Sequence, residues 1–573
     1  MATRPADARS GLPPGLEAAT LCEAFQRSAA NMADEVALRT LGGAVSITWR
    51  EYAERVRDLA AGLAGLGVKR GDNVALMLTN RPEFHLVDVA AMHLGAVAFS
   101  VYNTSSPEQI EYLLGDADNH VIVTEGAFLE RVQAAQPRCP ALEHIVVVEA
   151  LDELSARGGS GFDFDAAWQA VSPDDLVTLI YTSGTTGPPK GVQLTHAHVM
   201  AQWRAIHAVM PRPAGGRGIS YLPAAHVADR VITHYAAVIY GGQLTDCPDP
   251  REVIAHLPDV RPTLWGAVPR IWEKLKAALE AGMDDATRAA VDAALQDRAT
   301  PADEQVLRRL REGLGLDAAE HHIVGAAPTP PDVLEFFHAL GMNVCELWGM
   351  SETCGVATLN PADRVRIGTV GPPLPSVELR LAEDGEVLLR GPMCTSGYRN
   401  MPEKTAELLD GDGWLHTGDI GELDAEGYLR IVDRKKELII NAAGKNMSPA
   451  NIESALKSAS PLIGQACAIG DRRPYNVALL VLDPDALSVF AARHDLDAEA
   501  LGSLGAAETL IAAVADAVGT ANARLSRVEQ IKKFKILDED WLPGGDELTP
   551  TMKLKRKPIA EKYGDEIEAL YFD

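Results

Sequence analysis

Apolar and polar positions along the first third of the chain repeat with two periods, one typical of helices and one typical of strands. Residues 46–67 have the helical period and end at glycines, and residues 106–118 have it after Ser106, a side chain suited to a helix N-cap. Short apolar runs such as "DNVALMLT" (72–79) and "HVIVTE" (120–125) are typical of buried strands. Because helices and strands alternate at this spacing, the sequence predicts βαβ units and a mostly parallel sheet.

The pattern changes further along the chain. Residues 271–316 are rich in alanine, leucine and charged residues at helical spacing, which predicts a helical insertion. Residues 367–432 are rich in glycine and in β-type runs, which predicts small antiparallel sheets. From about residue 433 strand and helix patterns alternate again, so we expect a compact C-terminal lobe. Residues 1–16 are rich in proline, glycine and alanine and are expected to form a loose tail.

The composition is that of a globular protein and argues against several classes of function. The chain has 573 residues, 47% of them hydrophobic and 23% charged, and this length predicts two or three domains. The net charge of −27 argues against a protein that binds nucleic acid or an anionic membrane through bulk electrostatics. No stretch approaches 18 uncharged apolar residues, and the first 20 residues lack the apolar segment of a secretory signal.

The cysteines indicate a reducing compartment. The chain has 7 of them, an odd number, and none forms a Cys-x-x-Cys pair. This pattern favours free thiols over a disulfide framework or a zinc site, and we therefore predict a cytoplasmic protein.

The segment "IYTSGTTGPPKGVQLTH" (180–196) combines glycines, hydroxyl residues and one lysine after an apolar strand-like run. Glycine lets the backbone approach a ligand closely, so successive peptide N–H groups can point at one anion. The hydroxyl groups and the charge of Lys190 would complete a cradle for polyphosphate. The segment is not a Walker loop, because Lys190 is followed by Gly191 instead of serine or threonine. The structural alternative is a flexible hairpin at the surface.

Polar residues in three later segments each have a chemical and a structural interpretation. In "ELWGMSET", Glu352 could hold Mg²⁺, which prefers oxygen ligands, and Trp348 could stack on a purine; the alternatives are a surface carboxylate and a core tryptophan. Asp419 in "GWLHTGDIGEL" could accept both hydroxyls of a ribose, or it could be a turn aspartate. Lys553 in "DELTPTMKLKRKPI" could meet a ligand anion, or it could belong to a charged edge.

Taken together and in this order, the segments resemble the adenylate-forming superfamily of acyl-CoA synthetases, luciferases and peptide-synthetase adenylation domains. The resemblance covers nearly the whole chain and rests on "YTSGTTGPPKG", "ELWGMSET", "WLHTGD", "DRKKELI" and "TPTMKLKR". Within the superfamily the chain looks most like the long-chain fatty acyl-CoA synthetases, on the basis of "SYLPAAHVADR" and "RPTLWGAVPRIWEKL". The resemblance implies activation of a carboxylic acid by ATP to an acyl-AMP, followed by transfer to coenzyme A with release of AMP.

The resemblance also implies an architecture and a set of partners. It implies an α/β fold, with a large N-terminal lobe of stacked α/β sheets plus a small β subdomain, followed by a small mobile α+β C-terminal lobe. We place the AMP-binding and acyl-binding domain at 17–433 and the C-terminal lid domain at 434–573. The implied partners are a fatty acid, ATP, coenzyme A and Mg²⁺. Nucleic acid is not expected, peripheral contact with a membrane is compatible with this function, and the oligomeric state is open.

Individual residues receive roles by the same resemblance. Lys553 bridges the substrate carboxylate and the α-phosphate, while Glu352 and Thr182 hold Mg²⁺; these three are the expected catalytic residues. Asp419 and Arg434 hold the ribose. The complete expected ATP site consists of Thr182, Ser183, Gly184, Thr185, Thr186, Gly187, Lys190, Gly325, Ala326, Ala327, Trp348, Gly349, Ser351, Glu352, Asp419 and Arg434.

Trp348 departs from the family, which more often has tyrosine there, so stacking on adenine should survive while a phenolic hydrogen bond is lost. The expected acyl pocket includes Ala327, Gly349 and, at its entrance, His226. Ala224 stands where leucine is commoner, which leaves the acyl chain length open.

The C-terminal lobe is expected to rotate between the two half-reactions. Lys436 matches the hinge, and after rotation Gly444 would let the pantetheine arm of coenzyme A pass close to the backbone. No insertion follows the hinge, unlike in the fatty acyl-AMP ligases, so we expect complete thioester formation.

Two other functions are compatible with the sequence. One is an adenylate-forming ligase for a medium-chain or aryl acid or for a carrier-protein thiol. The other is a non-catalytic protein on the same fold that binds acyl groups or nucleotides, although the presence of Glu352, Asp419 and Lys553 argues against a decayed site.

Overall fold

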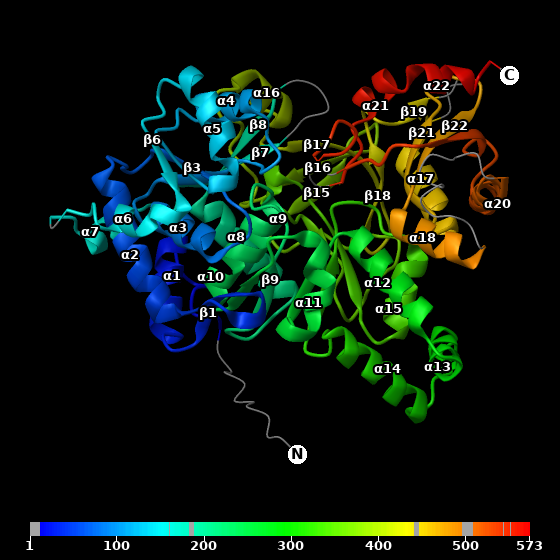
Figure 1. The fold of residues 1–573 in the computed structure, drawn as a ribbon, viewed down its shortest axis with the longest axis horizontal. Coiled ribbons are helices and arrows are strands. Elements are labelled where there is room, and N and C mark those ends of the chain that lie inside the picture. Colours follow the sequence, from blue (N-terminus) through cyan, green and yellow to red (C-terminus); the bar gives the residue numbers. More distant parts are fainter. Residues whose placement is uncertain are drawn as a thin grey trace.

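The computed structural model describes residues 12–159, 161–182, 188–440, 446–494, 508–542, 544–549 and 552–572. A large N-terminal body is followed by a smaller C-terminal lobe, drawn in orange and red, which lies against one end of that body (Figure 1). Helices and sheets occur in both parts, so the predicted α/β fold is confirmed.

The largest sheet has the strand order β6-β5-β3-β4-β7-β8. Neighbouring strands from β6 to β7 pair in parallel, and β8 runs antiparallel to β7, which confirms the predicted mostly parallel sheet. Strands β3, β4 and β5 are buried along their whole length, which explains their continuous apolar sequence. The strands are β3 (Asn73–Met77), β4 (Val97–Ser100), β5 (Val121–Thr124), β6 (His144–Val147), β7 (Leu176–Thr182) and β8 (Lys190–Thr195).

Helices pack around this sheet, and their starts follow the capping rules. Thr48 caps α2 and Ser106 caps α4, each through a reciprocal bond with the third helical residue, as Ser106 was expected to do. The helices of this region are α1 (Leu21–Asn31), α2 (Trp49–Gly65), α3 (Pro82–His93), α4 (Pro107–Asp116), α5 (Leu129–Ala135), α6 (Leu151–Ser155), α7 (Phe164–Gln169), α8 (His196–Val209), and the short η1 (Leu41–Gly43), η2 (Gly126–Phe128), η3 (Gln136–Arg138) and η4 (Val148–Ala150).

Two four-stranded sheets complete the central body. One has the order β2-β1-β10-β9 and the other the order β11-β12-β13-β14. Their strands are β1 (Val36–Thr40), β2 (Ser46–Thr48), β9 (Arg217–Ser220), β10 (Gln243–Asp246), β11 (Leu264–Ala267), β12 (His321–Val324), β13 (Val344–Trp348) and β14 (Thr358–Leu359). Between them run α9 (Val227–Asp229), the π-helix η5 (Arg230–Tyr235), α10 (Ala236–Tyr240), η6 (Pro250–Glu252), α11 (Val253–Val260), α15 (Pro331–Ala339) and η7 (Ser351–Thr353).

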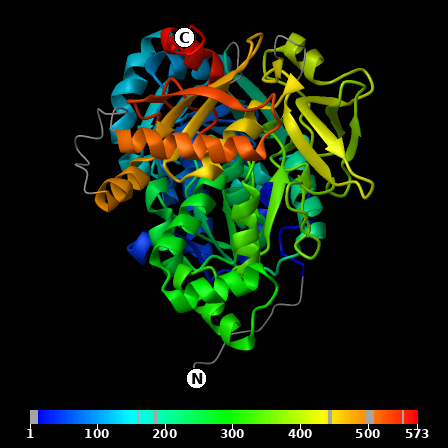
Figure 2. The same ribbon diagram turned by 90° about the vertical axis from the view of Figure 1, so that its right-hand side faces the viewer.

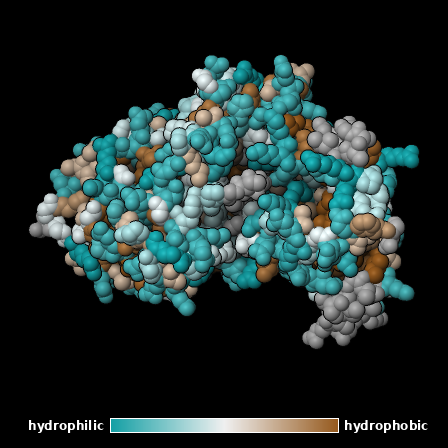
Figure 3. Space-filling view, turned by 90° about the horizontal axis from the view of Figure 1, so that it is seen from above, coloured by the Kyte–Doolittle hydropathy of each residue, from teal (hydrophilic) through white to brown (hydrophobic). Residues whose placement is uncertain are grey.

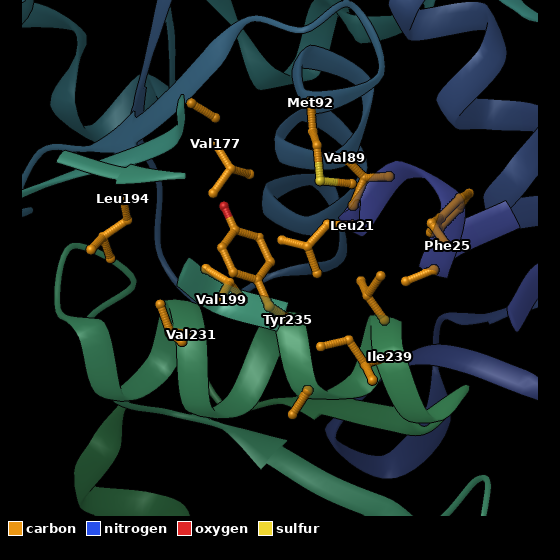
Figure 4. Close-up of a cluster of buried hydrophobic side chains, with 14 of the residues drawn as sticks. Leu21, Phe25, Val89, Met92, Val177, Leu194, Val199, Val231, Tyr235 and Ile239 are labelled. Atoms are coloured by element: carbon orange, nitrogen blue, oxygen red, sulfur yellow. The ribbon is translucent and has the colours of Figure 1, made fainter. Parts of the chain in front are cut away.

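The main hydrophobic core fills the space between the helices and the large sheet. Figure 4 shows Tyr235 of η5 among apolar side chains from α1, α3, α8 and the sheet, including Leu21, Met92, Val177 and Val199. All of these side chains are buried, so segments far apart in the sequence share one core.

A polar network of five residues is enclosed beside this core, between α3, η5 and β10. Arg230 and Asp88 form an ion pair, and both side chains are fully buried. His234 Nε2 lies 3.2 Å from Asp88 Oδ1, and His234 Nδ1 lies 2.9 Å from His85 Nδ1. His85 Nε2 lies 2.8 Å from Asp246 Oδ1, which completes a row from one carboxylate to the other.

The row of hydrogen bonds from Asp88 to Asp246 needs one proton more than two neutral histidines carry. Three hydrogen bonds between two ionised carboxylates need three protons, and two neutral imidazoles supply two. Burial opposes a charge on His85, but the attraction of Asp246 outweighs it and raises the pKa of His85. Burial lowers the pKa of His234 to about 4 and raises the pKa of Asp246, so the extra proton lies between His85 and Asp246 at the far end of the row.

Three helices, α12 (Pro269–Gly282), α13 (Asp285–Leu295) and α14 (Pro301–Leu314), occupy the segment in which a helical insertion was expected. Residues 378–434 form the antiparallel sheet β15-β16-β17-β18, as the glycine-rich pattern predicts, with one helix beside it. Its elements are β15 (Glu378–Leu381), β16 (Glu386–Arg390), α16 (Pro402–Leu408), β17 (Leu415–Leu423) and β18 (Leu429–Arg434).

The C-terminal lobe is built around the three-stranded sheet β21-β22-β23. Figure 2 shows this lobe above the helices of α12–α14 and beside the antiparallel sheet, with α20 lying across it. Its elements are β19 (Ile439–Ile440), β20 (Asn446–Met447), α17 (Pro449–Ala459), β21 (Ile463–Ile469), β22 (Asn476–Leu482), α18 (Pro484–Arg493), α20 (Glu508–Arg524), β23 (Ile531–Leu537), α21 (Arg556–Lys562) and α22 (Gly564–Ala569).

Ion pairs between α12 and the start of α18 join the lobe to the body. Arg270 pairs with Asp483, and Lys274 Nζ lies 3.0 Å from Asp485 Oδ2. The Arg270 pair is the better buried of the two, because the Asp485 side chain is 81% exposed. These contacts fix the lobe in the orientation that the structure shows.

The last residues of the segment expected to form a loose tail, 1–16, pack against the body. Pro13, Gly15 and Leu16 are buried, and the Gly15 N–H donates to Ile239 O at 2.9 Å. The sequence reasoning missed this contact, because proline and glycine suggest a loose chain whether or not a partner covers them. Seen from above, the surface is mostly hydrophilic with scattered apolar residues (Figure 3). Among the described residues, no helix has the length and apolar character that crossing a bilayer requires.

Candidate active site

Several of the expected site residues that the structure describes lie at or next to strand ends. Strand β7 ends at Thr182, β12 leads into Gly325, and β13 ends at Trp348. Asp419 and Arg434 face each other as register partners on β17 and β18. In open α/β sheets ligands bind beyond the carboxyl ends of the strands, and these residues mark such a position.

The two ends of the glycine-rich segment are held together by the sheet. Thr182 at the end of β7 and Lys190 at the start of β8 are register partners. Ser183, Gly184, Thr185, Thr186 and Gly187 lie outside the described residues, and the phosphate-binding role of the loop stays a prediction.

Lys190 and Glu352 meet through Tyr398, a residue that the sequence reasoning did not single out. Lys190 Nζ donates to the Tyr398 hydroxyl at 3.0 Å, and this hydroxyl donates to Glu352 Oε1 at 2.7 Å. Burial lowers the pKa of Lys190, while the charge of Glu352 opposes that shift. The tyrosine lies in "SGYRN", more than 40 residues from either partner in the sequence, where no spacing pattern indicates the contact.

Asp419 is held by two donors from different elements. Trp348 Nε1 donates to Asp419 Oδ2 at 2.9 Å, and Arg434 Nε donates to Asp419 Oδ1 at 2.9 Å. The carboxylate is only 4% exposed, and this burial raises its pKa, although Arg434 and Trp348 act in the opposite direction. Asp419 is thus a buried, bonded carboxylate and not the exposed turn residue of the structural alternative.

The chain packs so closely on either side of Trp348 that two positions have no room for a Cβ atom. A Cβ on Gly325 would lie 2.6 Å from Leu347 Cδ1, and a Cβ on Gly349 would lie 2.4 Å from Gly355 O. Ala326 has a φ of 73°, a left-handed value that few non-glycine residues adopt. Ala327 follows this turn and is exposed. Its side chain is small, so backbone atoms form much of the surface there.

Ser351 and Glu352 follow in the short helix η7, and both are buried. The Thr395 N–H donates to Glu352 O at 2.8 Å and fixes the backbone there. Among the described residues, no group of three or more acidic, histidine or cysteine side chains could enclose a metal ion. One carboxylate fits Mg²⁺ nevertheless, because this ion is usually held by one or two carboxylates together with substrate phosphates and waters.

Lys553 of the C-terminal lobe lies close to these residues of the body. Burial and the nearby charge of Arg434 lower its pKa, while Asp419 and Glu352 act against that shift. Burial and the charge of Lys553 also lower the pKa of His226 to about 3. The Lys553 side chain nevertheless keeps exposed surface.

Lys436 lies at the junction of the two parts, in the turn after β18. Its neighbour Lys435 pairs with Asp384 and Glu386 of the antiparallel sheet at 2.5 and 3.0 Å. Glu437 pairs instead with Arg556 of the C-terminal lobe at 3.1 Å. Lys436 itself is exposed between these two anchored residues. Gly444, the expected contact for coenzyme A, lies outside the described residues.

A narrow apolar cavity lies beside the site, between α8, η5 and the sheet of β11–β14. Its lining includes Trp203, Ile206 and Met210 of α8, Ile232 of η5, and Ile323 and Leu347 of the sheet. About 20 Å³ of it is open to the centre of a water molecule, so an acyl chain could enter only if side chains move. The expected acyl-pocket residues His226, Ala327 and Gly349 do not line this cavity. The cavity is nevertheless close to the site, because its lining residue Leu347 immediately precedes Trp348.

Comparison with known proteins agrees with this geometry. A family model described as "AMP-binding enzyme" matches residues 25–399, and one described as "AMP-binding enzyme C-terminal domain" matches residues 436–573. The chain belongs to the AMP-binding enzymes. The match covers both parts of this AMP-binding enzyme, and residue 436 begins the second.

Curated relatives of this AMP-binding enzyme have related names. It is 51% identical over 444 residues to the "Putative fatty-acid--CoA ligase fadD11" of Mycobacterium tuberculosis, a match that covers 73% of this chain and 78% of that protein. It is 37% identical over 557 residues to the "Long-chain-fatty-acid--CoA ligase FadD15" of Mycobacterium bovis, which covers 92% of each chain. The crystal structure of the anthranilate CoA ligase AuaEII with anthranoyl-AMP matches with a TM-score of 0.74 at 21% identity, over 95% of this chain and 97% of that one, which supports the fold alone.

Proposed function

We propose that this AMP-binding enzyme joins a long-chain fatty acid to coenzyme A through an acyl adenylate. The observation that carries the proposal is the position of Lys553 in the C-terminal lobe, close enough to Asp419, Glu352 and Arg434 of the body for their charges to act on its pKa. The names of the curated relatives support a fatty acid as the substrate.

In the first half-reaction, an oxygen of the fatty-acid carboxylate would attack the α-phosphorus of ATP, and the bond to the bridging oxygen of pyrophosphate would break. Both reactants are anions, so catalysis must come mainly from positioning and from neutralisation of charge. Lys553 and Lys190 would supply the cations, and Glu352 would hold Mg²⁺ against the phosphates, where the ion would neutralise part of their charge. Asp419 would accept hydrogen bonds from the ribose on its remaining lone pairs.

In the second half-reaction, the thiolate of coenzyme A would attack the acyl carbonyl, and AMP would leave with the oxygen of the former carboxylate. Lys553 would occupy the region of the first reaction, so the thiol would approach after this side chain has withdrawn. The exposed turn at Lys436 would allow the withdrawal, because its neighbours are anchored to different lobes. Gly444 is the proposed contact for the pantetheine arm.

The decisive experiment separates the two half-reactions. Pyrophosphate release from ATP should depend on added fatty acid, and AMP release should give an equal amount of acyl-CoA when coenzyme A is present. A panel of fatty, medium-chain and aryl acids assayed in this way identifies the substrate class. Pyrophosphate release that no acid stimulates would rule out the proposal and favour a non-catalytic binding protein.

We also propose that the enzyme takes its substrate from a membrane surface through peripheral contact, since long acyl chains partition into bilayers. Co-sedimentation with vesicles of zwitterionic lipid, with and without fatty acid, tests this point. A protein that stays in the supernatant in both cases would contradict it.

A further inference from the structure

Arg212 lines the far end of the apolar cavity, where Glu320 acts on it through its charge and no ion pair is formed with any described residue. Its Nε and Nη2 are buried, and neither has a hydrogen-bond partner among the residues that the structure describes. The guanidinium stacks over the Tyr240 ring, 4.2 Å from its centroid, and lies 5.4 Å from the centroid of Trp203. Buried donors of a charged group without hydrogen-bond partners are unfavourable, so these two nitrogens beside an apolar cavity call for an acceptor that arrives with a ligand.

The two free nitrogens form one recognition edge. Nε–H and Nη2–H of an arginine point in the same direction and match the two oxygens of a carboxylate. The same edge is filled elsewhere in this chain: Arg70 Nε and Nη2 donate to the two oxygens of Asp175 at 2.7 and 2.8 Å. Arg390 binds Glu378 through the same pair of nitrogens at 3.0 and 2.6 Å. At Arg212, Nε and Nη2 have no hydrogen-bond partner among the described residues.

The position of Arg212 relative to the active site sets the distance that a ligand must span. His321 at the start of β12 lies beside Arg212, because its Nε2 lies 3.2 Å from the carbonyl oxygen of Pro211. Gly325, at the other end of β12, lies at the candidate active site. At about 3.3 Å per residue these four steps correspond to about 13 Å. The cavity residues Ile323 and Leu347 lie between the two ends.

We propose that Arg212 is a subsite for a carboxylate at the far end of the acyl chain, so that α,ω-dicarboxylic acids belong to the substrates of this enzyme. One carboxyl group would be adenylated beside Lys553, while the other would be bound by Arg212 across the apolar cavity. The inference rests on the proposed function, because it requires that the cavity receives the acyl chain. Met210, which is unbranched and flexible, is suited to make room for that chain.

The test compares acids that differ only at the far end. For each chain length, kcat/KM for thioester formation is measured with the dicarboxylic acid, its monomethyl ester and the simple fatty acid. At the length that spans the cavity, we expect the wild-type enzyme to favour the dicarboxylic acid over its monomethyl ester by about 10- to 100-fold, as the loss of hydrogen bonds to a charged group implies. Arg212→Met should remove this preference, and Arg212→Lys, which keeps the charge without the fork, should retain only part of it.

Arg251→Met is the matched control, since Arg251 also binds a carboxylate through Nε and Nη2, but its side chain is 90% exposed at the surface. This variant should keep the wild-type preference. A wild-type enzyme that prefers the ester at every length, or a folded Arg212 variant with an unchanged ratio, would overturn the inference while leaving the proposed function intact. If instead no acid of any kind yields a thioester, the proposed function fails and this inference fails with it.

Discussion

Trp348 donates its indole N–H to Asp419 Oδ2 across 2.9 Å, and this bond ties the end of β13 to the hairpin of β17 and β18. The family more often has tyrosine at this position, and the sequence suggested that tryptophan would lose a polar contact. The indole nitrogen instead reaches the carboxylate that is proposed to hold the ribose. The substitution therefore changes the partner of the aromatic residue without removing its polar role.

Trp348→Phe should weaken ATP binding by about tenfold, because hydrogen bonds to charged groups contribute roughly 1.5–3 kcal/mol. The indole bond lowers the pKa of Asp419, so its loss should raise that pKa, and the acid limb of the pH–rate profile should move to higher pH. Calorimetry with ATP and a pH profile of adenylation provide the two measurements. An unchanged acid limb would show that the bond does not tune Asp419.

Tyr398→Phe should slow adenylation by about tenfold, since the hydroxyl that joins Lys190 to Glu352 is lost and a buried carboxylate loses a donor. Thioester formation from supplied acyl-AMP should change little. Tyr428→Phe is the control, because the Tyr428 hydroxyl donates to Arg364 O away from the site. Equal effects of the two substitutions on adenylation would mean that the Tyr398 hydroxyl serves stability alone.

Lys553→Ala should reduce adenylation by about 10²–10³-fold, the usual effect of removing one group that stabilises a transition-state charge. Acyl-AMP supplied to the variant should still react with coenzyme A at close to the wild-type rate. Single-turnover assays of each half-reaction measure the two effects. Lys557→Ala, at an exposed position of the following helix, is the control. Equal loss in both half-reactions would contradict the withdrawal of Lys553.

Lys436→Pro should preserve adenylation and slow thioester formation, because proline fixes φ near −65° at the junction between the two anchored residues. Lys436→Ala removes the charge but leaves the backbone free, so it should leave both half-reactions largely intact. The same pair of single-turnover assays distinguishes them. A proline variant with full rates in both would place the hinge elsewhere.

The buried polar network predicts a dependence of stability on pH. Asp229, which faces His85, Asp246, Ser220 and Asn80, has its pKa raised to about 7 by burial. The pKa of Asp229 in the folded protein exceeds the unfolded value. Its contribution to the free energy of unfolding is therefore complete below pH 4, and it is lost by about 1.4 kcal/mol per pH unit as the pH rises toward 7. His85, also with a raised pKa, acts in the same direction above pH 6.5.

Asp229→Asn removes this titration while keeping an oxygen that Ser220 can donate to. Relative to the wild type, the variant should gain about 2–3 kcal/mol of unfolding free energy between pH 5 and pH 8. Urea unfolding at the two pH values measures the difference. A difference between variant and wild type that is the same at both values would show that Asp229 is ionised throughout.

Much of the fold could be predicted because its signals are local. Ser106 caps α4 through its own third helical residue, and the apolar run at 73–77 forms a buried strand whatever its neighbours are. The order of the strands could not be predicted, since β7 joins β4 across more than 70 residues without a pairing signal in either strand. The network of His85 and Asp246 is equally long-range, and each residue alone looks like an ordinary polar residue.

The candidate site was predicted to the extent that its residues occur in recognisable motifs. Glu352, Asp419 and Lys553 were proposed in that way, and in the structure the charges of Glu352 and Asp419 act on Lys553. Tyr398 and Arg212 occur in segments without such a motif, and their roles follow from contacts made only in the folded chain.

The ion pairs that join α12 to α18 give this enzyme a sensitivity to ionic strength. Arg270–Asp483 and Lys274–Asp485 hold the lobe in the orientation in which Lys553 meets the body, and each such partly exposed pair contributes up to about 1 kcal/mol. Added salt screens these charges at distances beyond about 8 Å and weakens the closer ones. The balance between the two lobe orientations would then shift by a few-fold, so the salt content of the medium would set how the enzyme divides its time between making the adenylate and using it.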